Sequence, residues 1–117
     1  MTKTKLRLFT LVWAACIMTG AAIRGYRLGA NLQTTGALHI ATHFIVFAVL
    51  GLLLMLSFEA RPLRLLAILS GIALGFTTEL YEHLAFHSPM EFGDVLVDAL
   101  GVLAGAAARF LRKPSTP

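Results

Sequence analysis

The sequence predicts an all-α, polytopic membrane protein in which four transmembrane helices form one bundle. Hydrophobic residues make up 57% of its 117 residues and only 14% are charged, whereas a soluble domain carries about 25% charged residues. The mean hydropathy is +0.78. Four apolar stretches approach the roughly 20 residues needed to cross a bilayer as a helix. At this length, residues 1–117 are expected to form a single membrane domain.

Polar or helix-breaking residues delimit each predicted helix. The helices cover about residues 6–23, 38–58, 63–85 and 92–111, before a polar tail at 113–117. The first helix is expected to break at Arg24 and Gly25. The second ends before Pro62, which either stops that helix or starts the next. The third is expected to end between His87 and Pro89.

Basic residues are distributed unevenly between the two sides of the predicted bundle. With four spans, one side holds eight of them: Lys3, Lys5, Arg7, Arg61, Arg64, Arg109, Arg112 and Lys113. The other side holds only Arg24 and Arg27. Because cytoplasmic loops are rich in Lys and Arg, both termini are expected to be cytoplasmic. The basic residues do not gather on one face, so the net charge of +4 does not indicate nucleic-acid binding, and membrane lipids are the expected partners.

A cluster of carboxylates and histidines is the candidate functional site. Five of the six acidic residues lie within twenty positions: Glu79, Glu82, Glu91, Asp94 and Asp98. His83 and His87 lie in the same segment. The predicted topology brings them to a depth in the outer leaflet similar to that of His39 and His43 on the second helix. Ionisable groups at membrane depth are costly unless they face a partner or a wet cavity, so the cluster is a site hypothesis.

Helical spacing divides the cluster into two stripes. The third helix carries four residues spaced by four: Gly71, Gly75, Glu79 and His83. The fourth carries a stripe at the spacing of three and four that defines one helix face: Asp94, Asp98, Gly101, Gly105 and Ala108. Small residues at this spacing allow helix backbones to approach closely in lipid. We therefore expect the third and fourth helices to pack through these faces, with the acids turned inward.

His39 and His43 lie one helical turn apart, the spacing at which two imidazoles can share a metal. With Glu79 or Asp98 they would complete a His/carboxylate zinc site, which makes His39, His43 and Glu79 the metal candidates. Two other interpretations remain open: histidine–carboxylate pairs that fix the helix register, and a proton-transfer or polar substrate site. No cofactor and no bound metal is the primary expectation.

Two segments of the chain form a recognisable pattern. One is Glu79-x-x-Glu82 followed by Glu91-x-x-Asp94-x-x-x-Asp98-x-x-Gly101-x-x-x-Gly105, and the other is His39-x-x-x-His43-Phe44. Together they resemble the VanZ-like family of bacterial membrane proteins. Five residues match the family pattern: His43, Glu79, Asp94, Gly101 and Gly105. The sequence departs from it at five positions: Glu82 replaces a glutamine, Asp98 replaces an asparagine, His39 and Ile40 replace an Asp-Lys pair, and Ser88 replaces an arginine.

The resemblance implies a small helical protein of the bacterial inner membrane, with a link to glycopeptide (teicoplanin) resistance. We expect it to bind or handle a lipid or a lipid-linked envelope precursor at the outer leaflet rather than to act as an enzyme. His43, Glu79 and Asp94 form the expected core of the site, supported by Glu82, His83, Asp98 and His39. The alternatives are an intramembrane hydrolase or transferase that uses these residues, and a non-catalytic scaffold subunit. A homo-oligomer is compatible with the glycine faces.

Overall fold

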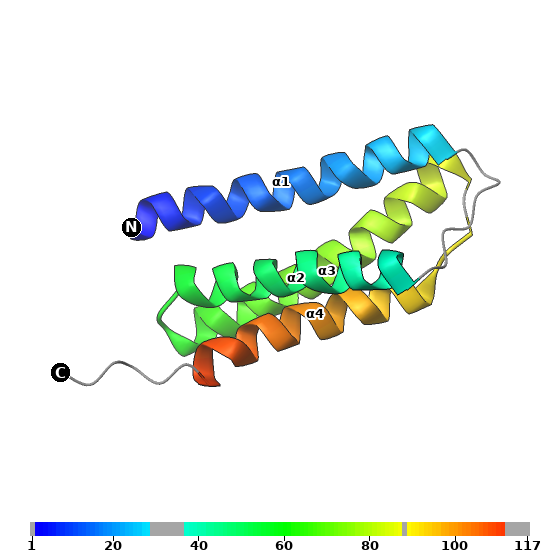
Figure 1. Ribbon diagram of the computed structural model, residues 1–117. Helices are drawn as coiled ribbons and strands as arrows, with labels where there is room; N and C mark the ends of the chain where they lie inside the picture. The colour runs from blue at the N-terminus through cyan, green and yellow to red at the C-terminus, as the bar shows by residue number, and fades with distance from the viewer. Residues whose placement is uncertain (1, 29–36, 88, 112–117) are drawn as a thin grey trace.

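The computed structural model describes residues 2–28, 37–87 and 89–111, with side chains left undescribed from residue 24 to 28. Within these ranges the chain is all-helical and contains no strand. The four helices are α1 (Lys3–Leu28), α2 (Ala37–Ser57), α3 (Arg61–Phe86) and α4 (Phe92–Leu111). They lie side by side with consecutive helices antiparallel, so α2 and α4 run in the same direction (Figure 1). The predicted fold class is confirmed in this respect.

Three of the helices are long and apolar enough to cross a membrane: α1, through residues Lys3–Ile23, α2 and α3. The fourth helix, α4, is not among these three, although its 20 residues span about 30 Å, the thickness of the hydrocarbon core. The reason is its charge, since it carries Asp94, Asp98 and Arg109. Length and composition therefore identify three candidate spans among the described helices.

The predicted helix bounds agree with the structure except at α1. Helix α4 covers the predicted range, and Pro62 is the second residue of α3, so this proline starts a helix. Helix α3 ends at Phe86, where His87 adopts a left-handed conformation with φ of 56°. The predicted break at Arg24 and Gly25 is wrong, because α1 continues to Leu28. One glycine costs a helix only about 1 kcal/mol, too little to end it.

Helices α2 and α4 make the closest contact in the bundle. Glycines bring their backbones together: a Cβ added at Gly101 would lie 2.6 Å from the Phe44 carbonyl oxygen. A Cβ at Gly105 would overlap the Ala48 carbonyl oxygen, and one at Gly51 would overlap the Val102 carbonyl oxygen. Only glycine fits at these three positions, so the two helices are fixed in one register.

The predicted packing of α3 and α4 through their two stripes is confirmed at Asp98 and wrong for the α4 glycines. Gly101 and Gly105 face α2, as described above. On α3, a Cβ at Gly75 would lie 2.8 Å from Asp98 Cβ of α4. A Cβ at Gly71 would lie 2.9 Å from Leu54 Cδ1 of α2 and 3.3 Å from a Val102 methyl of α4. Helix α4 thus sits in a groove between α2 and α3, with Val102 fully buried.

Helix α1 covers α2 and α3 from the side and is anchored near its N-terminus. Lys3 Nζ donates to the Leu56 carbonyl at 2.7 Å, and Arg7 Nε donates to the Ser57 carbonyl at 3.1 Å. Thr10 Oγ1 and Ser57 Oγ share a buried hydrogen bond of 3.0 Å. One basic end of the bundle therefore gathers the starts of α1 and α3 and the end of α4 (Figure 1).

Candidate functional site

Two histidine–aspartate pairs join α2 to α4 at the end of the bundle opposite the basic end. His39 Nε2 lies 3.1 Å from Asp94 Oδ2, and His43 Nδ1 lies 2.7 Å from Asp98 Oδ1. The pairing follows from the parallel direction of the two helices. His39 and Asp94 are each the third residue of their helices, and His43 and Asp98 are each the seventh. The histidines of α2 and the aspartates of α4 therefore have the same spacing of four residues and lie at the same distance from the starts of their helices.

The carboxylates of these pairs are buried and the imidazoles are partly exposed. The exposed fraction of the side chain is 2% for Asp98 and 11% for Asp94, against 14% for His39 and 21% for His43. A buried carboxylate is tolerated when it is paired and hydrogen-bonded. Asp98 accepts the Nδ1–H of His43, which leaves Nε2 as the nitrogen that faces the rest of the site. The pairs therefore stabilise the carboxylates and also set the orientation of His43.

Glu79 belongs to the same end of the bundle but has a different role. It is 4% exposed, and its Oε1 accepts the backbone N–H of Glu91 at 2.7 Å. The Glu91 carbonyl in turn accepts the N–H of Asp94 at 3.0 Å. Glu79 thus ties the end of α3 to the segment that begins α4. This contact positions Asp94 relative to α3.

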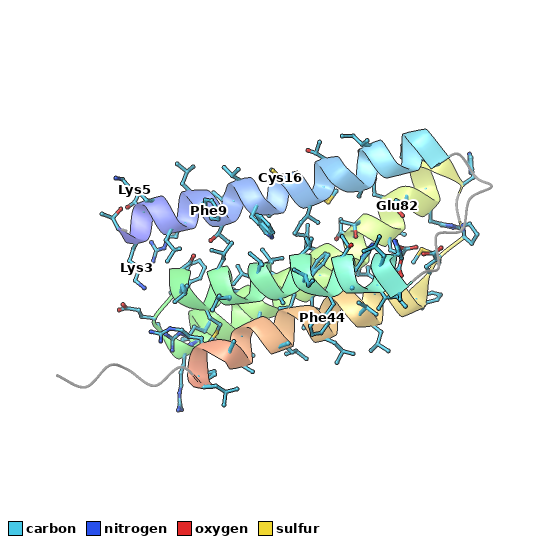
Figure 2. The ribbon with its side chains drawn as sticks, in the orientation of Figure 1. Lys3, Lys5, Phe9, Cys16, Phe44 and Glu82 are labelled. Carbon is cyan, nitrogen blue, oxygen red and sulfur yellow. The ribbon has the colours of Figure 1, made fainter. Side chains whose placement is uncertain are left out.

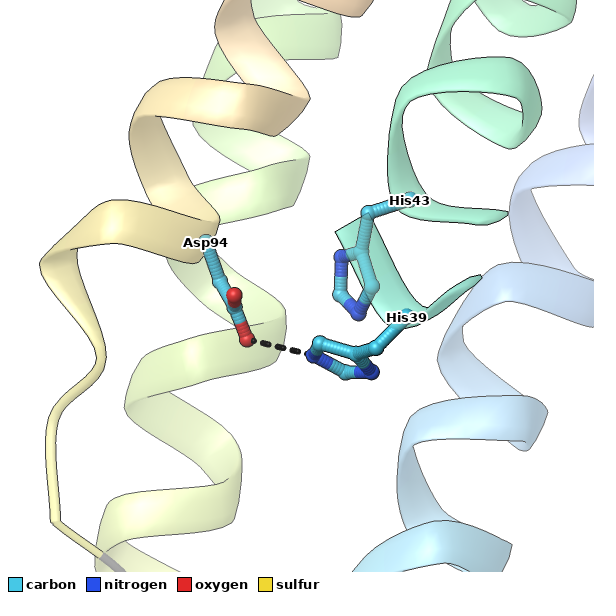
Figure 3. Close-up of side chains that lie close together, drawn as sticks. All are labelled: His39, His43 and Asp94. Carbon is cyan, nitrogen blue, oxygen red and sulfur yellow. Dashed lines mark hydrogen bonds and ion pairs between the residues drawn. The ribbon is translucent and has the colours of Figure 1, made fainter. Parts of the chain in front are cut away.

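Two groups of side chains in the described residues have the spacing of metal ligands. In the first, ligand atoms of His39, His43 and Asp94 all lie within 4.8 Å of one another. Figure 3 shows both imidazoles of α2 directed toward the Asp94 carboxylate of α4. The second group, with the same spacing, is Glu79, Glu91 and Asp94. The histidines are therefore grouped with Asp94 and not with Glu79 or Asp98, the two carboxylates proposed from sequence.

A cavity of about 350 Å³ lies between α1, α2 and α3 and reaches the histidines. Its polar side is formed by His39, His43, Thr78, Glu79 and Glu82, whereas its apolar side is lined by these residues of α1 and α2: Trp13, Cys16, Ile17, Ala21, Val46 and Phe47. Gly20, Cys16 and Thr42 line it and are also exposed, so the cavity opens at the surface of the bundle.

The structure brings most of the predicted site residues together. His39, His43, Glu79, Asp94 and Asp98 form the cluster described above, and Glu82 lies half-buried in the cavity wall. His83 is the exception, since it is exposed and is not among the cavity residues. It lies one turn beyond Glu79, and Glu79 already contacts the residue that precedes α4. The α3 stripe therefore reaches the level of the start of α4 at Glu79, and His83 lies beyond that level.

Sequence reasoning missed the contribution of α1 to the site. Trp13, the only tryptophan of the chain, lines the cavity, and its indole N–H donates to the Val46 carbonyl at 3.1 Å. Ile17 and Ala21 continue the cavity wall at a spacing of four. In the sequence, this contribution is indicated only by the i, i+4, i+8 spacing of Trp13, Ile17 and Ala21. The three residues carry no ionisable group, so they were not included among the site residues. Arg24 and Arg27, the two basic residues predicted on this side of the bundle, have side chains outside the described residues.

Comparison with known proteins identified no relative of this chain. No family model, no curated protein and no solved structure matches the chain. The resemblance to the VanZ-like family therefore stays a prediction.

Proposed function

We propose that this chain is a four-span membrane protein that binds an amphipathic molecule, a lipid or a lipid-linked envelope precursor, in the cavity between α1, α2 and α3. The observation that carries the proposal is the amphipathic lining of this cavity. Carboxylates, imidazoles and a hydroxyl form one side, and aliphatic and aromatic groups form the other. Such a lining matches a molecule with a polar head and an apolar chain.

The chemistry of the lining indicates which head groups fit. Glu79 and Glu82 offer oxygens that accept hydrogen bonds, so a head group rich in hydroxyl or amino donors is favoured over a bare phosphate. The volume of about 350 Å³ is at the lower end for small-molecule pockets, roughly 300–1,000 Å³. It holds a head group and the first part of a chain. The remainder would extend past Cys16 and Gly20 into the surrounding lipid.

Helix α4 meets the requirements of a fourth span despite its charges. Asp94 and Asp98 are turned into the bundle, where α2 supplies their histidine partners. The outward surface of α4 is apolar, with Leu96 62% exposed and Phe110 73% exposed. Intramembrane acids that face a bundle interior and are paired are the tolerated case.

The distribution of charge supports an orientation with both termini in the cytoplasm. Lys3 and Lys5 lie at the end of the bundle opposite Glu82 (Figure 2). Arg64 and Arg109 belong to helix ends on the same side as these lysines. By the positive-inside rule this end faces the cytoplasm, which places the His/carboxylate end at the outer leaflet of the bacterial inner membrane. If the VanZ-like resemblance holds, the bound molecule belongs to the envelope material on which glycopeptide antibiotics such as teicoplanin act.

Photolabelling with a matched pair of glycine variants tests the proposal. Gly20 lines the cavity and has open space around an added Cβ, and Gly93 has equal space but lies outside the cavity. Gly20→Phe therefore adds a large side chain at the cavity from a Cβ that meets no atom within 4 Å, and Gly93→Phe is its control. If the larger side chain displaces two methylenes of the ligand at about 0.8 kcal/mol each, binding falls roughly tenfold.

The probe is phosphatidylethanolamine with a diazirine in its acyl chain, added to the full-length protein in lipid nanodiscs. We expect peptide mapping to locate the label on residues 13–21 and 46–47 of the wild-type chain. Labelling of these residues should fall in Gly20→Phe and persist in Gly93→Phe. Equal labelling of both variants at these residues would refute cavity binding, and normal abundance with no labelling in any form would favour a scaffold subunit.

The geometry of His43 favours one second candidate, an intramembrane hydrolase or transferase. Its Nδ1–H is held by a carboxylate that is almost fully buried, the arrangement that orients a general base. Nε2 of His43 would then accept a proton from the attacking water or hydroxyl. Mass spectrometry of a total lipid extract incubated with wild-type protein and with His43→Gln tests this. A cleaved head group that appears only with the wild type supports the candidate, and identical lipid profiles oppose it.

A further inference from the structure

His39, His43 and Asp94 form a group whose separations match those of ligands around one metal ion. The ligand atoms lie within 4.8 Å of one another, and one pair, His39 Nε2 and Asp94 Oδ2, is 3.1 Å apart. Two ligands at roughly 2.0–2.1 Å from a tetrahedral zinc ion lie about 3.3 Å apart. Small rotations of side chains would bring all three donors to this separation.

The donor types select the metal. Two imidazoles and one carboxylate, without sulfur, are a known ligand set of zinc sites that keep the fourth position open. The charges also agree in sign, because Asp94 and Asp98 are carboxylates and a second pair, Glu79 and Glu91, lies within 4.8 Å of Asp94. A divalent cation offsets part of this negative charge, which lowers the cost of holding the carboxylates inside the bundle.

Asp98 supplies the outer contact that metal-binding histidines require. Histidine ligands usually donate their second ring N–H to a carboxylate, which fixes the tautomer and the direction of the ring. His43 Nδ1 is 2.7 Å from Asp98 Oδ1, so its metal-binding nitrogen is Nε2. Asp98 itself lies against Gly75, where an added Cβ would be 2.8 Å away from Asp98 Cβ. Asp98 is therefore a positioning residue with little freedom to move.

The helices that carry the ligands are held rigidly. The contacts of Gly101 with Phe44 and of Gly105 with Ala48 fix α4 against α2 within about three turns of the ligands. A site on two helices in fixed register holds its geometry better than one on a loop. Access is also provided, since His39 and His43 line the open cavity. The fourth coordination position would face this cavity.

From these contacts we infer that His39, His43 and Asp94 bind one Zn²⁺ per chain, with Asp98 as positioning residue. The inference goes beyond the proposed binding of an amphipathic molecule and does not depend on it. If photolabelling fails and zinc binds, the metal site stands alone. If labelling succeeds and zinc does not bind, the cavity acts through its protein groups only.

Metal titration of the full-length protein in detergent tests the inference. The chain is purified with a tag free of histidine, stripped of metal and titrated with ZnCl₂ in a calorimeter, and bound zinc is counted by elemental analysis. We expect one zinc ion per chain. Loss of an outer contact to a metal-binding histidine lowers metal affinity roughly 10–100-fold. His39→Gln and His43→Gln each remove a ligand, so each should lower zinc affinity by more than this. The double variant His83→Ala/His87→Ala removes the other two of the four histidines and should bind as the wild type does.

Cobalt spectra separate ligand loss from misfolding. Co²⁺ in place of Zn²⁺ gives visible absorption bands whose intensity reports the coordination geometry, and these bands should appear in the wild type and in the His83/His87 control. Asp98→Leu should weaken binding about 10–100-fold and alter the bands, whereas Asp98→Asn keeps an acceptor for His43 and should largely restore both. The inference is overturned if the wild-type chain binds no zinc, or if zinc binding disappears in the His83/His87 control.

Discussion

Gly101→Ala provides the sharpest test of the α2–α4 contact that supports the site. The added Cβ would lie 2.6 Å from the Phe44 carbonyl oxygen and 3.1 Å from Phe47 Cβ, against 3.4 Å or more for ordinary contact. The nearest atom belongs to the backbone, so it cannot rotate away. The two helices must therefore separate by roughly 0.8 Å at this level. Overpacking of this kind costs about 1–3 kcal/mol.

The separation also acts on the nearest histidine–aspartate pair. His43 directly precedes Phe44, and Asp98 lies three residues before Gly101. A shift of about 0.8 Å would stretch the 2.7 Å bond between His43 Nδ1 and Asp98 Oδ1 toward 3.5 Å, the limit for a hydrogen bond. Gly101→Ala should therefore lower both stability and zinc affinity.

The measurement is unfolding of the full-length protein by SDS in mixed micelles, followed by circular dichroism. We expect the free energy of unfolding to fall by roughly 1–3 kcal/mol in Gly101→Ala. Gly93→Ala, on the same helix but with no atom within 4 Å of the new Cβ, should match the wild type. If Gly101→Ala unfolds at the wild-type SDS concentration, the backbones of α2 and α4 do not touch at this level and the reasoning fails.

Three further predictions concern other parts of the bundle. Gly75→Ala should lose about 1–3 kcal/mol in the same SDS assay, because its Cβ would meet Asp98 Cβ at 2.8 Å; unchanged stability would contradict the contact. A double-mutant cycle of Thr10→Val and Ser57→Ala should give a coupling near 0.6 kcal/mol for their 3.0 Å hydrogen bond, and additive effects would show that the pair contributes nothing. A fluorescent reporter fused after Pro117 should be active in the cytoplasm, and a periplasmic signal from an enzymatic reporter there would reverse the topology.

Much of the fold could be predicted from the sequence because composition and helix length determine it. The range of α4 was predicted from an apolar stretch bounded by the polar segment before Phe92 and by basic residues at its end. Pro62 marked the boundary between α2 and α3, although the sequence left open whether it ended one helix or began the next. The end of α1 at Leu28 was missed because Arg24 and Gly25 were interpreted as a helix break. The helix continues through both residues.

Helical periodicity predicts which face of a helix is buried but not which helix covers it. The glycines of α4 were assigned to α3 because the two helices are consecutive in the chain, and they instead contact α2. A signal for the correct partner was present. His39 and His43 on one helix, and Asp94 and Asp98 on another that runs in the same direction, have the same spacing of four. Complementary pairs at equal intervals on parallel helices indicate direct contact.

Helix α1 and the His/Asp pairs contribute to the candidate site through different side chains. The polar contacts described between α1 and α2 lie between Lys3 and Trp13, whereas the cavity is lined by α1 residues from Trp13 to Ala21. Beyond Trp13, Ile17 and Ala21 add apolar groups to the cavity wall. The pairs that hold the carboxylates join α2 to α4 and contain no residue of α1. A substitution at Ile17 or Ala21 therefore alters the cavity wall without removing a member of either pair.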